Sequence, residues 1–125
     1  MKWLLLIVAG FSLTLGAGFC GIAHAHESQP GLLAIRQLSA DRYQVTWRAP
    51  IYYGRPHPAR LVLPAGWQTV GEPTVRPLSD SILHRRIVAL QGDSLDGSVI
   101  RFPGLEATIT DVFVRLTRLD GSESS

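Results

Sequence analysis

Alternating apolar and polar positions dominate the chain after residue 30. The clearest alternation lies in DRYQVTWRAP (residues 41–50), where Tyr43, Val45 and Trp47 occupy every second position. Because successive side chains of a strand point to opposite faces, this pattern predicts a strand with one buried face. The preceding run, GLLAIRQLS, is joined to it by a short Ser-Ala-Asp link, which predicts a β-hairpin.

Further apolar runs predict strands at ARLVLP (residues 59–64), SILHRRIVAL (81–90), SVIRF (98–102) and LEATITDVFVRLTRL (105–119). The inward face of SILHRRIVAL is ambiguous, because Leu83 with Ile87 and Ile82 with Val88 fit it equally well. Prolines and glycines interrupt two other segments. They predict a loop for IYYGRPHP (51–58) and irregular edge structure for WQTVGEPTVRPL (67–78).

These runs show no convincing helical period. About five to seven short strands separated by turn signals predict an all-β domain, a small antiparallel β-sandwich of immunoglobulin-like type. We expect its core to contain Val45, Trp47, Leu61, Val112 and Val114.

The start of the chain has a different pattern. A short positive segment, Met1-Lys2, precedes the apolar run WLLLIVAGFSLTL and the small-residue site Ala23-His24-Ala25, a layout typical of a secretory signal peptide. We expect residues 1–25 to be removed and residues 26–125 to form the extracytoplasmic β-sandwich domain, exported to the periplasm or the outer face of the membrane. The alternative is an uncleaved N-terminal anchor, because the uncharged segment could span a bilayer core of about 30 Å.

The cysteine content, the distribution of arginines and the absence of catalytic motifs each argue against particular classes of function. The single cysteine, Cys20, lies in the predicted signal peptide, so the mature domain can hold neither a disulfide nor a thiolate metal site. Its eleven arginines are dispersed singly apart from Arg85-Arg86, and we therefore expect no nucleic-acid partner. The sequence has no nucleophile elbow, Gly-rich phosphate loop or CxxC motif, which predicts a non-enzymatic protein without an evident small-molecule substrate.

Four pieces of the mature part together resemble the extracytoplasmic N-terminal region of HupE/UreJ-like membrane proteins. They are Ala25-His26-Glu27-Ser28 with Pro30, VTWRAP (residues 45–50), LPAG (63–66) and, most specifically, GLEATITDVFVRL (104–116). Their order and spacing carry the resemblance. Gln29 departs from the arginine expected between Ser28 and Pro30.

The resemblance implies an extracytoplasmic β domain. Members of this family continue into several transmembrane helices, to which their accessory roles for hydrogenase and urease and their nickel movement belong. This chain has no apolar stretch after Leu119. We therefore expect a non-enzymatic domain that assists a separate HupE/UreJ-like membrane protein, either as a stand-alone relative or as one half of a split protein.

The predicted processing site suggests an alternative function. Cleavage after Ala25 would make His26 the first residue, and its amine and ring nitrogen could chelate a metal ion. Glu27 could add an oxygen, and His84 or His57 could add a third group. Nitrogen ligands of this kind suit Cu(II) and Ni(II), so the alternative is a small periplasmic copper- or nickel-binding protein. The competing interpretation is that His26 and Glu27 merely follow a processing site.

Other candidate residues have structural interpretations. The polar-aromatic loop with Tyr52, Tyr53 and His57 could carry function, although an ordinary solvated loop is favoured. Asp111 and Arg115 lie about 13 Å apart along a strand and cannot pair with each other. We expect each of them, like Arg48, to pair with a neighbouring strand or to cap a turn.

Overall fold

The computed structural model describes residues 29–92 and 94–125. The predicted signal peptide and the candidate ligands His26 and Glu27 lie outside the described residues. The described part is all-β, as expected, and none of its helices is long and apolar enough to cross a membrane.

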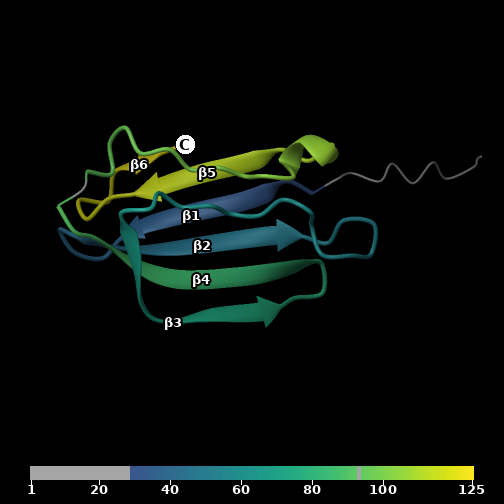
Figure 1. Cartoon of the computed structure of the whole chain (residues 1–125), viewed down its shortest axis with the longest axis horizontal. Helices are drawn as coiled ribbons and strands as arrows, with labels where there is room; N and C mark the ends of the chain where they lie inside the picture. Colours follow the sequence, from purple (N-terminus) through teal and green to yellow (C-terminus); the bar gives the residue numbers. More distant parts are fainter. Residues whose placement is uncertain (1–28, 93) are drawn as a thin grey trace, which may run out of the picture.

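In the part of the chain that the structure describes, six strands form one sheet in the order β3-β4-β2-β1-β5-β6 (Figure 1). Their bounds are β1 (Gly31–Gln37), β2 (Arg42–Pro50), β3 (Trp67–Pro77), β4 (Ser81–Leu90), β5 (Val112–Thr117) and β6 (Glu123–Ser124). A 3-10 turn, η1 (Leu105–Ala107), precedes β5. The predicted hairpin of β1 and β2 is confirmed, with Ile35 opposite Val45.

The sheet is mixed, which corrects the expectation of an antiparallel one. β5 pairs with β1 in parallel, from Gly31 opposite Val112 to Arg36 opposite Thr117. A parallel pair needs a long crossover connection. Residues 94–111 supply the last part of this connection, because they lead back across the sheet to the start of β5 (Figure 1).

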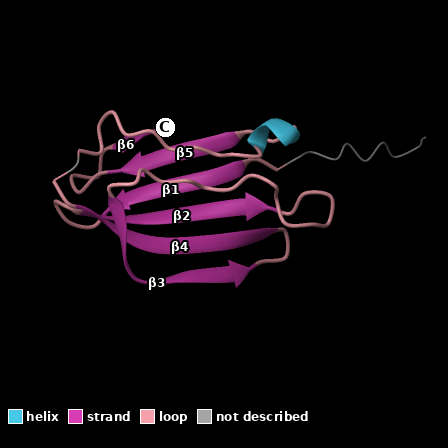
Figure 2. Cartoon of the chain, viewed as in Figure 1, coloured by secondary structure: helices cyan, strands magenta, loops and turns pink. Residues whose placement is uncertain are grey.

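The predicted sandwich is not confirmed, because all the named strands of the described part belong to one sheet. Two loop segments, residues 51–66 and 94–111, take the place of a second sheet and cover one face (Figure 2). The strands predicted at 59–64 and 98–102 are reduced to one isolated bridge between Val62 and Arg101. Pro58, Pro64 and Pro103 flank this bridge and lack the N–H groups that would extend it.

The core lies between the sheet and these two loops. Val45 and Trp47 are buried as predicted, next to Leu33 and Val88, which are fully buried. Leu61 and Val112 are only partly buried. The predicted burial of Val114 is wrong, since 40% of its surface is exposed. β5 lies near the edge of the sheet, and β6 beyond it pairs with Leu116 and Thr117 but not with Val114.

The segment predicted to be irregular, residues 67–78, forms the edge strand β3 instead. Its pairing with β4 shifts register between Val70 and Thr74, where Gly71 has a positive φ of 73°. Such a bulge, together with Pro73, is tolerated at an edge because one side of the strand makes no ladder hydrogen bonds. The expected edge position is therefore confirmed, whereas the expected irregularity is limited to this bulge within a continuous strand.

The register of β4 with β2 shows which residues of β4 face the core, a question that the sequence left open. Trp47 lies opposite His84, and Tyr43 lies opposite Val88, so Ile82, His84, Arg86 and Val88 share the covered face with the core. Leu83, Arg85 and Ile87 point to the other face of the sheet. The covered face therefore receives two polar side chains in a strand whose far end, at Val88 and Leu90, is buried and apolar.

Candidate functional site

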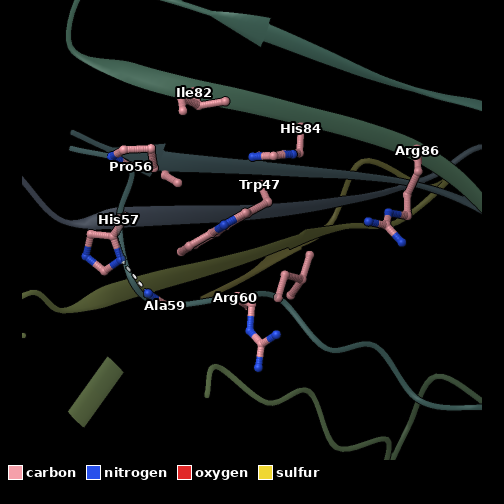
Figure 3. Close-up of a pocket in the computed structure, with 10 residues that line it drawn as sticks. Trp47, Pro56, His57, Ala59, Arg60, Ile82, His84 and Arg86 are labelled. Carbon is pink, nitrogen blue, oxygen red and sulfur yellow. Dashed lines mark hydrogen bonds between the residues drawn. The ribbon is translucent and has the colours of Figure 1, made fainter. Parts of the chain in front are cut away.

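A cavity of about 350 Å³ lies on the covered face, between the sheet and the loop after β2 (Figure 3). Strands β2 and β4 supply one wall, and the loop supplies the opposite wall. The lining residues are Trp47 and Ala49 from β2, Ile82, His84 and Arg86 from β4, and Pro56, His57, Ala59, Arg60 and Leu61 from the loop.

Arg86 is the unusual group of this cavity. It is half-buried on the core-facing side of β4, two residues from the fully buried Val88. Within the described part of the chain, Arg86 forms no ion pair, since the two salt bridges found there join Arg48 to Asp80 and Arg118 to Asp96. A half-buried guanidinium without an acidic partner attracts an anion, because burial weakens the screening of its charge by water.

His57 is held by the backbone of its own loop. Its Nδ1 accepts a hydrogen bond from the Ala59 N–H at 3.1 Å, drawn as the dashed line in Figure 3. Burial lowers the pKa of His57, so the ring is neutral at pH 7 and carries its proton on Nε2. Nε2 is buried and has no hydrogen-bond partner among the described residues.

His84 is neutral for a related reason. Burial, and then the positive charge of Arg86, lower the pKa of His84 below its usual value. The formal charge of the cavity at pH 7 therefore comes from its two arginines. Arg86 extends from β4 toward the loop, while the guanidinium of the exposed Arg60 points away from Trp47 (Figure 3). Arg86 is thus the cation that faces the space between the two walls.

Of the three residues predicted to hold a metal, only His84 can be placed. It lines the cavity together with His57, while His26 and Glu27 lie outside the described residues. The described residues contain no group of three or more His, Cys, Asp or Glu side chains that could hold a metal ion. Arg86 disfavours a cation beside His84 by direct charge repulsion.

The loop that forms the outer wall contains the predicted polar-aromatic cluster. The Tyr52 ring stands edge-on to the rings of Tyr53 and His57, with centroid distances of 4.7 and 5.4 Å. Tyr52 also pairs with Arg55 through two backbone hydrogen bonds. The loop is thus ordered by its own aromatic residues, and it contributes Pro56 and His57 to the cavity.

A second candidate site is the opposite face of the sheet, here called the uncovered face. Pairing registers place side chains on it in rows that cross several strands. One row runs Arg76, Leu83, Arg48, Leu32 and Phe113, and the next runs Thr74, Arg85, Thr46, Ala34 and Arg115. By the same registers, six arginines of the described strands lie on this face: Arg36, Arg42, Arg48, Arg76, Arg85 and Arg115.

Arg48 is the one arginine of these six with an acidic partner in the described part. Its guanidinium donates hydrogen bonds to both oxygens of Asp80, at 2.9 and 3.2 Å, and to Ser81 Oγ at 3.0 Å. Hydrogen bonds from Ser81 and Arg48 lower the pKa of Asp80. The predicted pairing of Arg48 with a neighbouring strand is confirmed, whereas Asp111 and Arg115 form no ion pair among the described residues.

No basic run in the sequence marks this arginine-rich face. The arginines are separated along the chain, yet Arg42 and Arg48 share a strand at even spacing and therefore a face. The sequence does contain one indication of this face. Arginines that are separated by an even number of positions within a predicted strand point to the same side of the sheet.

Comparison of the chain with protein-family models, with curated proteins and with solved structures gave no match.

Proposed function

We propose that the protein is a non-enzymatic exported domain that assists a HupE/UreJ-like membrane protein and binds it through the uncovered face. The observation that carries this proposal is the collection of six arginines on one face of the sheet, five of them without an acidic partner in the described part. Such a face complements an acidic surface, and an extracytoplasmic loop region of a membrane protein is the partner implied by the family resemblance.

The chemistry of the uncovered face fits a protein partner. Guanidinium groups bind carboxylates through two parallel hydrogen bonds, which gives orientation as well as attraction. Exposed apolar side chains lie among the arginines, notably Phe113 at 62% and Ile87 at 36% exposure. Arginine and aromatic side chains are the residue types enriched at protein interfaces.

A further feature supports the proposal. Arg60 N and Val62 N donate to Pro103 O and Arg101 O, at 3.0 and 2.9 Å. This short ladder over the sheet is what a reduced second layer of a β-sandwich would retain.

The test is co-purification from the native host in mild detergent. The wild-type chain should retain a multi-helix membrane protein of the HupE/UreJ type, identified by mass spectrometry. The double variant Arg85→Glu/Arg115→Glu should lose it, because it reverses two charges about 14 Å apart across three strand spacings of the uncovered face.

Arg86→Gln is the matched control, because Arg86 follows Arg85 in the chain but points to the covered face. It should retain the partner at the wild-type level. Equal capture by the wild type and by the double variant would contradict the proposal. Binding of the wild type to acidic phospholipid vesicles without any protein would also contradict it, since it would identify a lipid surface as the partner.

One observation favours the alternative, a copper- or nickel-binding protein. His57 and His84, two imidazoles that could complete a site begun by His26, line the same cavity. Calorimetry with Cu(II) and Ni(II) on the processed protein tests this function. An additional residue ahead of His26 removes the free amine from this histidine but leaves its ring. It should therefore weaken binding by at least about tenfold, as expected for the loss of one ligand of a chelate.

The variant His84→Gln separates the contributions to such a site. If the metal uses His26 and His84 together, both changes should weaken binding. Equal affinity for the proteins with and without the additional residue would show that the N-terminal chelate does not exist. The metal-binding function would then be rejected, and the docking function would be unaffected.

A further inference from the structure

The cavity on the covered face contains a combination of groups that docking through the uncovered face does not use. It combines one half-buried cation, Arg86, with the aromatic surface of Trp47 and the aliphatic side chains of Ile82 and Leu61. Its volume of about 350 Å³ lies at the lower end of the range of about 300–1,000 Å³ that is typical of small-molecule sites.

The position of Arg86 interrupts the apolar pattern of the covered face. The other inward side chains of β4 toward its end, Val88 and Leu90, are buried apolar residues in the core. An apolar residue at position 86 would continue that pattern, whereas arginine interrupts it and leaves a charge without an acidic partner in the described part. An anionic ligand would satisfy this group.

The neighbouring groups define the kind of anion. His84 and His57 are neutral at pH 7, so the cavity offers one inward-facing charge rather than a cluster of cations. A single guanidinium matches the planar, singly charged carboxylate. The apolar remainder of the wall, formed by Trp47, Ile82 and Leu61, matches an apolar group attached to that carboxylate.

We propose that this cavity binds a small carboxylic acid, with its carboxylate on Arg86 and its apolar group against Trp47 and Ile82. This site goes beyond the docking function and revises the expectation that the protein has no small-molecule ligand. It lies on the opposite side of the sheet from the uncovered face, so the two sites have separate residues.

The experiment titrates the processed full chain with benzoate, with the neutral analogue benzamide and with inorganic phosphate. Binding is followed by amide NMR spectra and by tryptophan fluorescence. Benzoate should shift the signals of residues that line the cavity, and benzamide should bind at least about tenfold more weakly, because it lacks the charge-assisted hydrogen bonds to Arg86. Phosphate, which has no apolar group, should also bind more weakly than benzoate.

A second readout is the titration of the His84 ring. In the free protein, burial and then the charge of Arg86 lower the pKa of His84. A bound carboxylate places a negative charge nearby and favours the protonated ring, so benzoate should raise the pKa of His84. A purely structural role of Arg86 would not produce this ligand-dependent change.

Arg86→Gln should weaken benzoate binding by at least about tenfold, while the adjacent Arg85→Gln, on the uncovered face, should leave it unchanged. If Arg86→Gln fails to fold, the comparison of benzoate with benzamide still tests the site in the wild-type protein. Equal binding of these two probes, tighter binding of phosphate, or an absence of shifts at the cavity would each overturn the proposal. The partner capture described above depends on Arg85 and Arg115, so failure of either proposal is distinguishable from failure of the other.

Discussion

Replacing Trp47 with alanine should lower the free energy of unfolding by about 3–5 kcal/mol, the range typical of a large buried aromatic residue. Only 4% of the Trp47 surface is exposed. Its ring centroid lies 5.2 Å from that of Phe102, which belongs to the loop layer. Truncation would therefore remove a contact between the sheet and the loops that cover it, in addition to leaving a cavity.

The packing around Trp47 leaves little opportunity for collapse. A Cβ atom added to Gly31 would lie 2.5 Å from Trp47 Cη2, so the indole already touches the backbone of β1. Because strand backbones hold their positions through ladder hydrogen bonds, the space left by the indole cannot be closed by a small local shift. We expect the cost to lie in the upper part of the range.

Thermal or urea unfolding of the processed protein measures this change. For a domain of about 100 residues, 1 kcal/mol corresponds to about 4–8 °C in Tm, so the Tm should fall by more than about 10 °C. Phe113→Ala is the control, since Phe113 is also an aromatic residue in a strand but is 62% exposed. It should change the free energy of unfolding by less than about 1 kcal/mol. Equal losses for the two variants would contradict the assignment of Trp47 to the core.

The central strands were predictable because apolar and polar residues alternate along their sequences. β1 and β2 each bury one face in a two-layer structure, and their period of two is therefore visible in the sequence, as at Tyr43, Val45 and Trp47. In β4 the alternation is obscured because polar His84 and Arg86 point inward while Leu83 and Ile87 point outward. The residues that blur the pattern are those that build the cavity.

The loop layer and the parallel pairing were not predictable from local pattern. Leu61 and Leu63 look like strand residues, but their apolar side chains pack on the core from a segment whose prolines prevent a longer ladder. The parallel pairing of β1 with β5 depends on where residues 94–111 return to the sheet, which no short-range signal encodes. The two candidate sites arise from this tertiary arrangement. Of the residues that line the cavity, His57 and His84 were predicted as candidate ligands, whereas Trp47 and Leu61 were predicted only as core residues.

Gly104→Ala should destabilise the protein by about 2–5 kcal/mol for two independent reasons. Gly104 has a φ of 91°, a left-handed conformation that costs a residue with a Cβ about 1–2 kcal/mol. An added Cβ would also lie 2.5 Å from the carbonyl oxygen of Pro58 in the other loop of the covering layer. Forcing such atoms apart in packed structure costs about 1–3 kcal/mol.

The Pro58 carbonyl cannot move freely away from such a Cβ. The next residue, Ala59, donates its N–H to His57 Nδ1, and Arg60 N donates to Pro103 O at 3.0 Å. Displacement of Pro58 would therefore strain both hydrogen bonds and the wall of the cavity that contains His57. We expect Gly104→Ala to shift the NMR signals of His57 and Ala59 as well as to lower the stability.

Gly97→Ala separates the two reasons, because Gly97 has a similar positive φ of 78° but no atom within 4 Å of an added Cβ. It should lose only the conformational part, about 1–2 kcal/mol, and should leave the His57 signals in place. The difference between the two variants in urea unfolding then measures the close approach of the two loops at Gly104. Equal losses, or a Gly104→Ala spectrum unchanged at His57, would mean that the loop layer is not packed at this point, and the cavity wall would lose its main structural support.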